Sequence, residues 1–429
     1  MRYQPIPPTL FEDRRKEFTK KMVKGSLAVF YSNDPMPRSG DQFFPFRQDS
    51  DLFSLSGLDQ PETIIVLYPA AKNPTHREMA FILAHDPEHA IWHGDRYSTK
   101  EAKAISGIDK IHTIEKWDRI MPALFRSVET IYINPRQQDR FDTPVFSQND
   151  RMAEMLKKKY PGKKYIDAHS ILRHMAMIKH PMEIGQLKKA VDITGKAFDR
   201  VLHTIKPGMK EYEVEAELSY IINQNGCHHA FEPIVASGKS ACTLHYIQND
   251  RIIKEDELVL IDFGAEYAHM ASDMTRTIPA SGRFNKRQRA IYLAVMSVLD
   301  EITAIMRPGI SLEQLNKETG KLIERELLQL KIISKSDLRK QDPASPLVRK
   351  YFMHGVSHHL GYDVHDKGER TVPLKAGMVL TCEPGLYIPE EQIGIRLEND
   401  ILITRGKPKN LMGHIPIDPD EIESIMNAR

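Results

Sequence analysis

The sequence predicts an α/β (α+β) protein of two domains. The chain has 429 residues, which is more than one ordinary hydrophobic core usually organises. Its first part alternates short β-rich runs with helical stretches, as layered α/β domains do. Beyond residue 179 a different pattern begins, in which a helix-rich unit occurs twice. We therefore expect an N-terminal domain over residues 1–178 and a larger domain over residues 179–429.

Four apolar runs in the first domain predict buried strands, and two longer segments predict helices. The runs are short and rich in β-branched and aromatic residues, whereas the longer segments have helical character. The strands are expected at SLAVFY, TIIVLY, MAFILAH and TIYIN, and the helices at WDRIMPALFRSV and RMAEMLKKKY. This part has no cluster of catalytic residue types.

The domain boundary is expected near Lys179, in the segment IKHPMEIGQLKKAVDITGKAFDRVL. Pro181 ends the preceding segment, because proline restricts the residue before it. Apolar residues then recur at roughly helical spacing and predict a long amphipathic helix. They are Ile184, Leu187, Val191, Phe198, Val201 and Leu202.

A weak internal repeat divides the second domain. The segment PGMKEYEVEAELSYIINQNG, from Pro207, resembles PGISLEQLNKETGKLIEREL, from Pro308. Each has Pro-Gly after one helix, then another amphipathic helix, then β-rich sequence with a pair of carboxylates. Such a repeat predicts two similar halves packed about a shared interface, where a site can form.

The first carboxylate pair lies in ELVLIDFGAEYAHMASDMTRTIPA. ELVLIDF and SDMTRTIP both have the character of strands. If the chain reverses around Tyr267 and Ala268, then Asp262 and Asp273 lie directly opposite each other. A lone aspartate at a strand end is often a turn or capping residue, and a register shift of one residue would move a carboxylate to the other face.

The second pair lies in VLTCEPGLYIPEEQIGIRLENDILI. A reversal centred on Glu390 and Glu391 places Glu383 opposite Glu398. Like charges directly across a sheet are destabilising, and one carboxylate is pushed to protonate unless a positive charge lies between them. Two such pairs in one domain therefore predict bound cations.

The composition of the chain argues against several classes of protein. The formal net charge is only +2, so no global field indicates a nucleic-acid-binding or membrane-surface protein. The three cysteines, Cys227, Cys242 and Cys382, lack metal-site spacing and are expected to be reduced thiols. The first residues lack a signal peptide's apolar core, and no apolar run reaches membrane-spanning length. We expect a cytoplasmic protein.

Four histidines lie close together in HGVSHHLGYDVHD, which runs from His354 to Asp366. Such histidines can be metal ligands, proton carriers, a chance cluster or a weak metal-binding tract, and the local sequence does not choose among these. The nearby carboxylate pairs favour a metal or catalytic site, because such sites require clusters of Asp, Glu and His.

These residues resemble the five-ligand dimetal site of the pita-bread superfamily, which includes methionine aminopeptidase, aminopeptidase P and prolidase. The matching motifs are HGVSH, TCEPG and IRLEND, and the five positions are Asp262, Asp273, His358, Glu383 and Glu398. FRQDSDLFSLSGLDQPETIIVLYP is similar to the smaller domain of aminopeptidase P relatives. The resemblance implies a creatinase-like α/β N-terminal domain followed by a pita-bread domain with a pseudo-twofold repeat.

The resemblance also assigns roles to the histidines. His358 corresponds to the metal-binding histidine, while His354 and His365 match the histidines that hold the substrate and stabilise the reacting carbonyl. His245, in SACTLHYIQND, matches a histidine that lines the substrate site; on its own it would be taken for a core histidine. His359 is expected to be structural.

Two divalent ions are implied as cofactors, with manganese expected from the resemblance. Four carboxylates and one imidazole favour manganese, cobalt, iron or magnesium over a cysteine-type structural zinc site, and catalytic zinc stays possible. Arg396, two residues before Glu398, is expected to bind substrate or to support the ligands through a charge-assisted bond; a solvated surface pair is the alternative. Cys382 should point away from the ligands.

The implied mechanism is hydrolysis of a peptide bond. Two ions bridged by Asp273 and Glu398 would hold a water, lower its pKa and present a metal-bridging hydroxide to the amide. Glu383 would carry the proton toward the leaving amine. His365 would stabilise the charge on the carbonyl oxygen, and His354 would help to fix the peptide.

The resemblance favours aminopeptidase P activity. Such an enzyme releases the N-terminal residue of a peptide whose second residue is proline. An X-Pro amide lacks an N–H, so its cleavage needs a pocket shaped to the proline ring, bordered by His245, His354 and His365. Prolidase, which cleaves X-Pro dipeptides, is the alternative, and Arg370 is its candidate for holding the dipeptide carboxylate. A noncatalytic pita-bread binding protein and a metal-free creatinase-like hydrolase are alternatives of other classes, and both normally lack several of the ligands.

Trp92, in HAIWHGDRY, bears on the assembly. Relatives place an aromatic residue from one subunit near the active site of another, which implies a homodimer or homotetramer. The alternative is that Trp92 is a packing anchor within its own domain.

Overall fold

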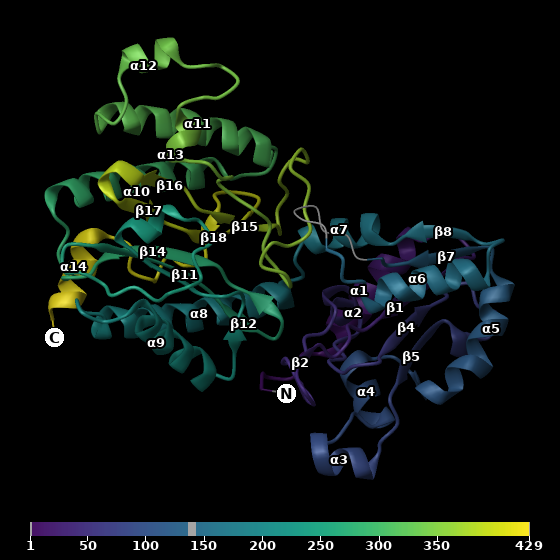
Figure 1. Cartoon of the computed structure of the whole chain (residues 1–429). Helices are drawn as coiled ribbons and strands as arrows, with labels where there is room; N and C mark the ends of the chain where they lie inside the picture. The colour runs from purple at the N-terminus through teal and green to yellow at the C-terminus, as the bar shows by residue number, and fades with distance from the viewer. Residues whose placement is uncertain (1, 136–142, 429) are drawn as a thin grey trace. The chain divides into compact units, whose positions relative to one another are not determined.

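The computed structural model describes residues 2–135 and 143–428, and the chain divides into two compact units. The N-terminal unit is Gln4–Met175, and the C-terminal unit contains the chain from Ala176 onward together with Arg2 and Tyr3. Figure 1 labels the elements of both units. None of the helices within the described ranges combines the length and the apolar character that crossing a membrane requires.

A six-stranded mixed sheet forms the centre of the N-terminal unit, in the order β6-β5-β4-β1-β7-β8. β4 pairs antiparallel with both β1 and β5, and the other neighbours are parallel. The four predicted strands are present as β1, β4, β5 and β7. The bounds are β1 Leu27–Tyr31, β4 Ile64–Leu67, β5 Glu78–Ile82, β6 Lys110–Thr113, β7 Thr130–Ile133 and β8 Lys164–Asp167.

Helices cover both faces of this sheet, so its central strands are apolar on both sides. On β1, Leu27 and Val29 face a core that α5 and α6 complete, while Ala28 and Phe30 face a second core with α1, α2, α4 and α7. The two predicted helices are present as α5 and α6. The bounds are α1 Pro8–Lys21, α2 Ser50–Ser56, α4 Thr99–Ser106, α5 Trp117–Ser127, α6 Gln148–Lys159 and α7 His169–Met177.

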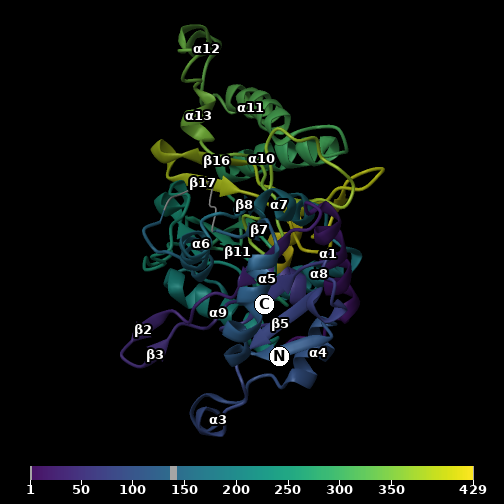
Figure 2. The same ribbon diagram turned by 90° about the vertical axis from the view of Figure 1, so that its right-hand side faces the viewer.

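Two exposed pieces extend from the N-terminal unit, the β2–β3 hairpin and helix α3, as Figure 2 shows. Their bounds are β2 Pro37–Ser39, β3 Gln42–Phe43 and α3 Pro87–His93. Trp92 on α3 is 81% exposed, so it is not a packing anchor within the described chain. Short 3-10 turns occupy Pro74–His76 and Ile114–Lys116.

The C-terminal unit consists of two helix–hairpin halves. Figure 1 shows α8 and α9 on one side of the strands and α10 and α11 on the other. The helices are α8 Pro181–Thr204, α9 Glu211–Gln224, α10 Lys286–Ile305, α11 Leu312–Gln329, α12 Lys335–Lys340, α13 Val348–Tyr351 and α14 Pro419–Asn427. Helices α9 and α11 both follow a Pro-Gly pair, as the repeat predicts.

The strands of the C-terminal unit form small antiparallel sheets in the orders β10-β11-β14, β13-β12-β9, β15-β18-β19 and β16-β17. Their bounds are β9 His228–His229, β10 Ile234–Ser237, β11 Leu258–Phe263, β12 Ala265–Tyr267, β13 Met270–Ala271, β14 Met274–Pro279, β15 Val379–Cys382, β16 Gly385–Ile388, β17 Ile393–Arg396, β18 Asn399–Leu402 and β19 Lys409–Asn410; 3-10 turns lie at Gly238–Cys242 and Pro389–Glu391. Asp262 lies on β11, and the other acidic residues of the predicted metal site directly flank β14, β15 and β18.

One glycine permits the close approach of two strand segments beside that site. Gly264 follows β11, and a Cβ atom built on it would lie 1.7 Å from the carbonyl oxygen of Ser272. That oxygen is a backbone atom, so rotation of a side chain cannot make room for the added methyl group. Gly320, in the interior of α11, has open space around the same position.

We predict that Gly264→Ala destabilises the protein by about 3 kcal/mol, because the added methyl group forces the two backbone segments apart. Gly320→Ala is the matched control, and it should stabilise the protein by about 0.5–1 kcal/mol because alanine favours a helix interior. Urea denaturation followed by circular dichroism measures both. Equal effects of the two substitutions would contradict the close approach at Gly264.

Candidate metal centre

The first carboxylate pair lies where β11 and β14 run antiparallel. Asp262 pairs with Thr275, not with Asp273, so the predicted register is wrong by two residues. The reason is the turn, which is centred on Ala268 and His269 with φ of 52° and 63°. Two successive left-handed residues make a tight hairpin turn. Because the shift is even, Asp262 and Asp273 still share one face of the sheet.

The second pair lies in the other half of the unit. Glu383 directly follows β15, and Glu398 directly precedes β18. Cys382 pairs with Asn399, and β16 pairs with β17 in the same alignment. This is the alignment that the predicted reversal requires, and it brings Glu383 and Glu398 to adjoining strands.

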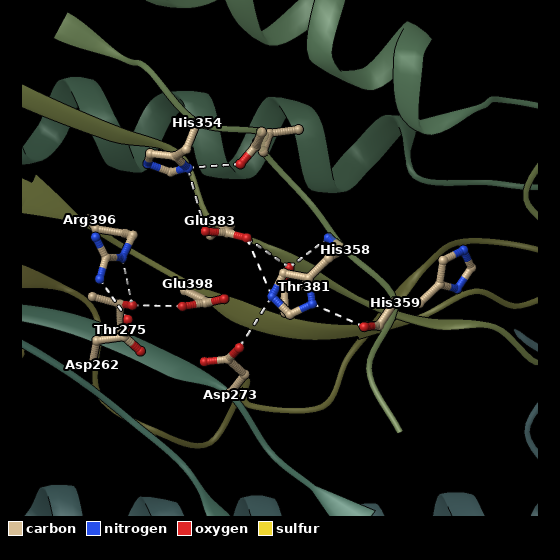
Figure 3. A network of polar contacts seen from close by, with 12 residues as sticks. Asp262, Asp273, Thr275, His354, His358, His359, Thr381, Glu383, Arg396 and Glu398 are labelled. Atoms are coloured by element: carbon tan, nitrogen blue, oxygen red, sulfur yellow. Dashed lines mark hydrogen bonds and ion pairs between the residues drawn. The ribbon is translucent and has the colours of Figure 1, made fainter. Parts of the chain in front are cut away.

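His358 joins these residues because its segment runs beside β15. The Thr381 N–H donates to the His358 carbonyl at 3.0 Å, and the Glu383 N–H donates to the Val356 carbonyl at 2.9 Å. The His358 N–H in turn donates to Thr381 Oγ1 at 3.1 Å. These bonds place the imidazole between Glu383 and Asp273, one residue from each carboxylate pair (Figure 3).

The side chains converge on one buried point. Ligand atoms of Asp273, His358 and Glu398 all lie within 4.8 Å of one another. His358 Nε2 is 3.3 Å from Asp273 Oδ2 and 3.5 Å from Glu383 Oε1. Asp262 lies at the edge of the group and contacts Arg396 (Figure 3). Residues from both halves therefore meet at the shared interface.

Burial and mutual repulsion act strongly on the carboxylates. Burial raises the pKa of Asp273 well above its ordinary value, and the charges of Glu398 and Asp262 raise it further. Burial, followed by the charge of Glu383, raises the pKa of Glu398 in the same way. Without a cation, the centre therefore favours retaining protons.

The donor set fits divalent cations. His358 Nδ1 lies 3.0 Å from the His359 carbonyl, so a neutral imidazole that donates there directs its Nε2 lone pair at the carboxylates of Asp273 and Glu383. A lone pair facing carboxylate oxygens is unfavourable unless a positive charge lies between them. Asp262 Oδ1 is also buried and receives no hydrogen bond from any group in the described part of the chain. Cations would satisfy both groups.

Two threonines, which the sequence analysis missed, hold the glutamates. Thr275 Oγ1 donates to Glu398 Oε2 at 2.6 Å, and Thr381 Oγ1 donates to Glu383 Oε1 at 3.3 Å. Each stands two residues from an acidic residue on its own strand segment, Thr275 after Asp273 and Thr381 before Glu383. That spacing places them on the site face and could have identified them.

Arg396 is buried and contacts the site from the second half. Its Nη2 lies 2.6 Å from Asp262 Oδ2, its Nε donates to Thr275 Oγ1 at 3.1 Å, and its Nη1 donates to the Tyr387 hydroxyl at 2.9 Å. The arginine is 4% exposed, which is incompatible with a solvated surface pair. It links Asp262 of one half to the strand that precedes Glu398 in the other.

Asp400 and Arg276 also connect the two halves. Asp400 Oδ2 accepts from the Asp273 N–H at 3.3 Å, and Arg276 Nη1 donates to the Glu398 carbonyl at 2.6 Å. Thr275 and Asp400 stand at equivalent positions, two residues after Asp273 and Glu398. Each half therefore contributes a polar side chain that supports the acidic residue of the other half.

His354 lies at the Glu383 side of the centre. Its Nδ1 is 2.8 Å from the Gly355 carbonyl and 3.6 Å from Glu383 Oε2, and its Nε2 is 2.7 Å from the Tyr387 hydroxyl. Burial, and then the charge of Arg396, lowers the pKa of His354 to about 3. The imidazole is therefore neutral near neutral pH.

The other histidines occupy different environments. The His365 ring lies edge-on to the His358 ring, with centroids 4.3 Å apart, and His365 is exposed. His245 is exposed, and its charge contributes to the lowered pKa of His354. His359 is buried, and desolvation lowers its pKa to about 3. Cys382 is buried, and its sulfur lies 4.0 Å from the Leu299 carbonyl of α10.

Comparison with protein families agrees with this geometry. Residues 185–405 match metallopeptidase family M24, and residues 11–132 match the aminopeptidase P N-terminal domain. The chain is 34% identical to Xaa-Pro aminopeptidase of Escherichia coli (strain K12), over 97% of each sequence. It is 32% identical to human Xaa-Pro aminopeptidase 3, over 96% of this chain and 83% of that protein.

Solved structures give the same result. A putative aminopeptidase P from Bacillus anthracis superposes with a TM-score of 0.92 at 32% identity, with 99% of each chain covered. Zinc-substituted E. coli aminopeptidase P in complex with product superposes with a TM-score of 0.88 at 32% identity, again over 99% of each chain. The expected pita-bread architecture is confirmed, and the chain belongs to metallopeptidase family M24, with the N-terminal domain of aminopeptidase P.

Proposed function

We propose that this protein is an Xaa-Pro aminopeptidase that removes the first residue from peptides with proline in second position. The observation that carries the proposal is the convergence of Asp262, Asp273, His358, Glu383 and Glu398 at one buried interface. It is supported by 34% identity, over 97% of each sequence, to Xaa-Pro aminopeptidase of Escherichia coli.

We propose that the centre binds two divalent ions and that the ion is manganese. The residues that would hold the ions are Asp262, Asp273, His358, Glu383 and Glu398. The five side chains offer mostly carboxylate oxygen with one imidazole, which suits manganese. When bound, such ions supply Lewis acidity and activate water at neutral pH. The residues around them determine how the peptide and the proton are placed.

Glu383 is the residue we assign to proton transfer. Thr381 holds one of its carboxylate oxygens at 3.3 Å, and the other lies 3.6 Å from His354 Nδ1. These contacts hold the carboxylate at the side of the centre that His354 occupies. From there it can take a proton and deliver it to the proline nitrogen as the amide breaks.

His354, His365 and His245 are the residues we assign to the substrate. His354 is neutral, so it places a polar group beside the peptide without adding a charge. His365, exposed beside the His358 ring, would donate to the carbonyl oxygen as negative charge develops there. His245 would border the proline ring. Arg396, fully engaged with protein groups, would act by fixing Asp262.

Residues 179–429 would form the catalytic domain of a cytoplasmic enzyme. Trp92, 81% exposed on α3, would contact another copy of the chain in a homodimer or homotetramer, and sedimentation velocity measures which one forms. Prolidase activity is the second candidate. For that activity, Arg370, which is exposed in the segment before β15, is the residue we assign to the dipeptide carboxylate.

The substrate class is tested with an X-Pro dipeptide and an X-Pro-Y-Z peptide, using metal-stripped protein with and without manganese. We expect manganese-dependent release of the first residue from the longer peptide. Cleavage of the dipeptide alone would assign the protein to prolidase. Bound manganese with no cleavage of either peptide would show that the substrate class is wrong.

Thr275→Val should lower manganese affinity by about 10–100-fold, because Glu398 loses the hydroxyl that orients it. Thr319→Val is the matched control, since Thr319 is equally buried and donates to the Leu315 carbonyl within its own helix, α11. Isothermal titration of metal-free protein measures both affinities. Equal affinities in the two variants would contradict the role of Thr275.

Manganese affinity should rise as pH rises above the ordinary carboxyl range and through the raised pKa values of the centre, with release of protons on binding. The cause is the raised pKa of Asp273 and Glu398, ordinarily 3.8 and 4.5. Metal-free protein should show the opposite trend in stability. A raised carboxyl pKa stabilises the fold fully below the ordinary value, and this contribution is lost as pH rises through the raised value. Calorimetry in buffers of different ionisation enthalpy counts the protons, and a pH-independent affinity would contradict the raised pKa values.

A further inference from the structure

His365 stands on a long irregular segment. Between His359 and the start of β15 at Val379 the chain contains neither helix nor strand. Backbone hydrogen bonds of a regular element therefore do not hold the imidazole. Catalytic groups must be held to within a fraction of an ångström, so another interaction has to fix this segment.

A buried ion pair lies directly beside His365. Lys179 Nζ is 2.7 Å from Asp366 Oδ2, and the two side chains are only 2% and 4% exposed. The partners are 187 residues apart in the sequence. Burial raises the pKa of Asp366, and the charge of Lys179 opposes that rise. The carboxylate is thus held by a partner from the beginning of the C-terminal unit.

Both partners are also fixed through the backbone. The Asp366 N–H donates to the His359 carbonyl at 2.9 Å, and the Lys179 N–H donates to the Gly377 carbonyl at 2.9 Å. Lys179 Nζ also donates to the Ala176 carbonyl. The ion pair therefore connects the start of the irregular segment, at His359, with its end, at Gly377.

Two glycines allow close packing around the pair. A Cβ atom on Gly361 would lie 2.0 Å from Asp366 Oδ2 and 2.6 Å from Lys179 Nζ. A Cβ atom on Gly368 would lie 1.9 Å from His359 Cδ2. Glycine lets the segment pack tightly against the pair at position 361 and against His359 at position 368.

We infer that the Lys179–Asp366 ion pair is a positioning pair that holds His365 against the metal centre. Asp366 is fixed by its carboxylate and its N–H, so the peptide bond that joins it to His365 is fixed as well. A buried ion pair adds little net stability compared with an apolar replacement, but removing one partner leaves the other charge buried and unpaired. Each of the two side chains is therefore held where the other can reach it. The catalytic consequence of this inference rests on the proposed function, whereas the placement of His365 does not.

The test uses the full chain and the variants Lys179→Met, Asp366→Asn and the double variant. The ¹H–¹³C signal of the His365 ring, in protein labelled at histidine Cε1, is assigned with His365→Gln and recorded at one pH. Manganese stoichiometry, kcat and KM on an X-Pro-Y-Z peptide are measured alongside. Arg15→Met is the matched control, because it breaks the bonds of a buried cation in the N-terminal unit.

We expect the His365 signal to shift or broaden in all three variants, with manganese stoichiometry unchanged. The value of kcat should fall about 10–100-fold, as a misplacement of about 1 Å can cause, and KM should change less. The double variant should recover the unfolding midpoint lost in the single variants, but neither kcat nor the His365 signal. Arg15→Met should lower stability and leave both unchanged.

An unaltered His365 signal in Lys179→Met, or recovery of kcat together with stability in the double variant, would overturn the inference and make the pair purely structural. Lys179→Arg, which keeps the charge, should retain more activity than Lys179→Met. If the wild-type chain cleaves no X-Pro peptide, the proposed function fails, and the His365 signal still decides whether the pair positions that ring.

Discussion

Repulsion among buried carboxylates is the constraint on which the C-terminal unit depends. Asp273 and Glu398 come from different halves of the unit, and their ligand atoms lie within 4.8 Å of one another and of His358. In water such charges would separate, and in a buried site they would take up protons. The surrounding structure must therefore hold them together before any cation is bound. Most of the polar contacts around the centre serve this purpose.

Rigid backbone and buried cations together supply that restraint. The two hairpins hold the carboxylates on adjoining strands, and Gly264 lets the first hairpin close tightly. Arg396 offsets the charge of Asp262, while Arg276 binds the carbonyl of Glu398. These arginines offset only part of the negative charge. The remainder suits two divalent ions, so the protein contributes an organised excess of negative charge that metal can neutralise.

The sequence predicted the elements well because their signals are local. β1, β4, β5 and β7 are short runs of β-branched and aromatic residues, and α5 and α6 have helical spacing. The register of the first hairpin was wrong because Ala268 and His269 adopt positive φ without the Asn-Gly or Gly signal that usually marks such a turn. Nothing local revealed the partnership of Lys179 with Asp366 either, since it depends on how distant segments pack.

The threonines that hold the two glutamates were not recognised from the sequence for a related reason. Thr275 and Thr381 are ordinary residues for strands, and only their alternation with the acidic residues sets them apart. Histidine roles were easier to suggest, because HGVSHHLGYDVHD is an unusual stretch whose resemblance to a family is specific. The structure separates the two neighbouring histidines by their environments. His358 faces the carboxylates, whereas His359 packs in the interior.

The exchange of support between the halves bears on how such a centre can arise. Thr275 of the first half orients Glu398 of the second, and Asp400 of the second half holds the backbone of Asp273 in the first. A single half would possess one acidic pair but would lack the groups that keep that pair in place. It could complete a centre only by associating with a copy of itself about a twofold axis, where each copy would supply the missing group to the other. In the present chain that dimer is internal, so assembly of the centre does not depend on protein concentration.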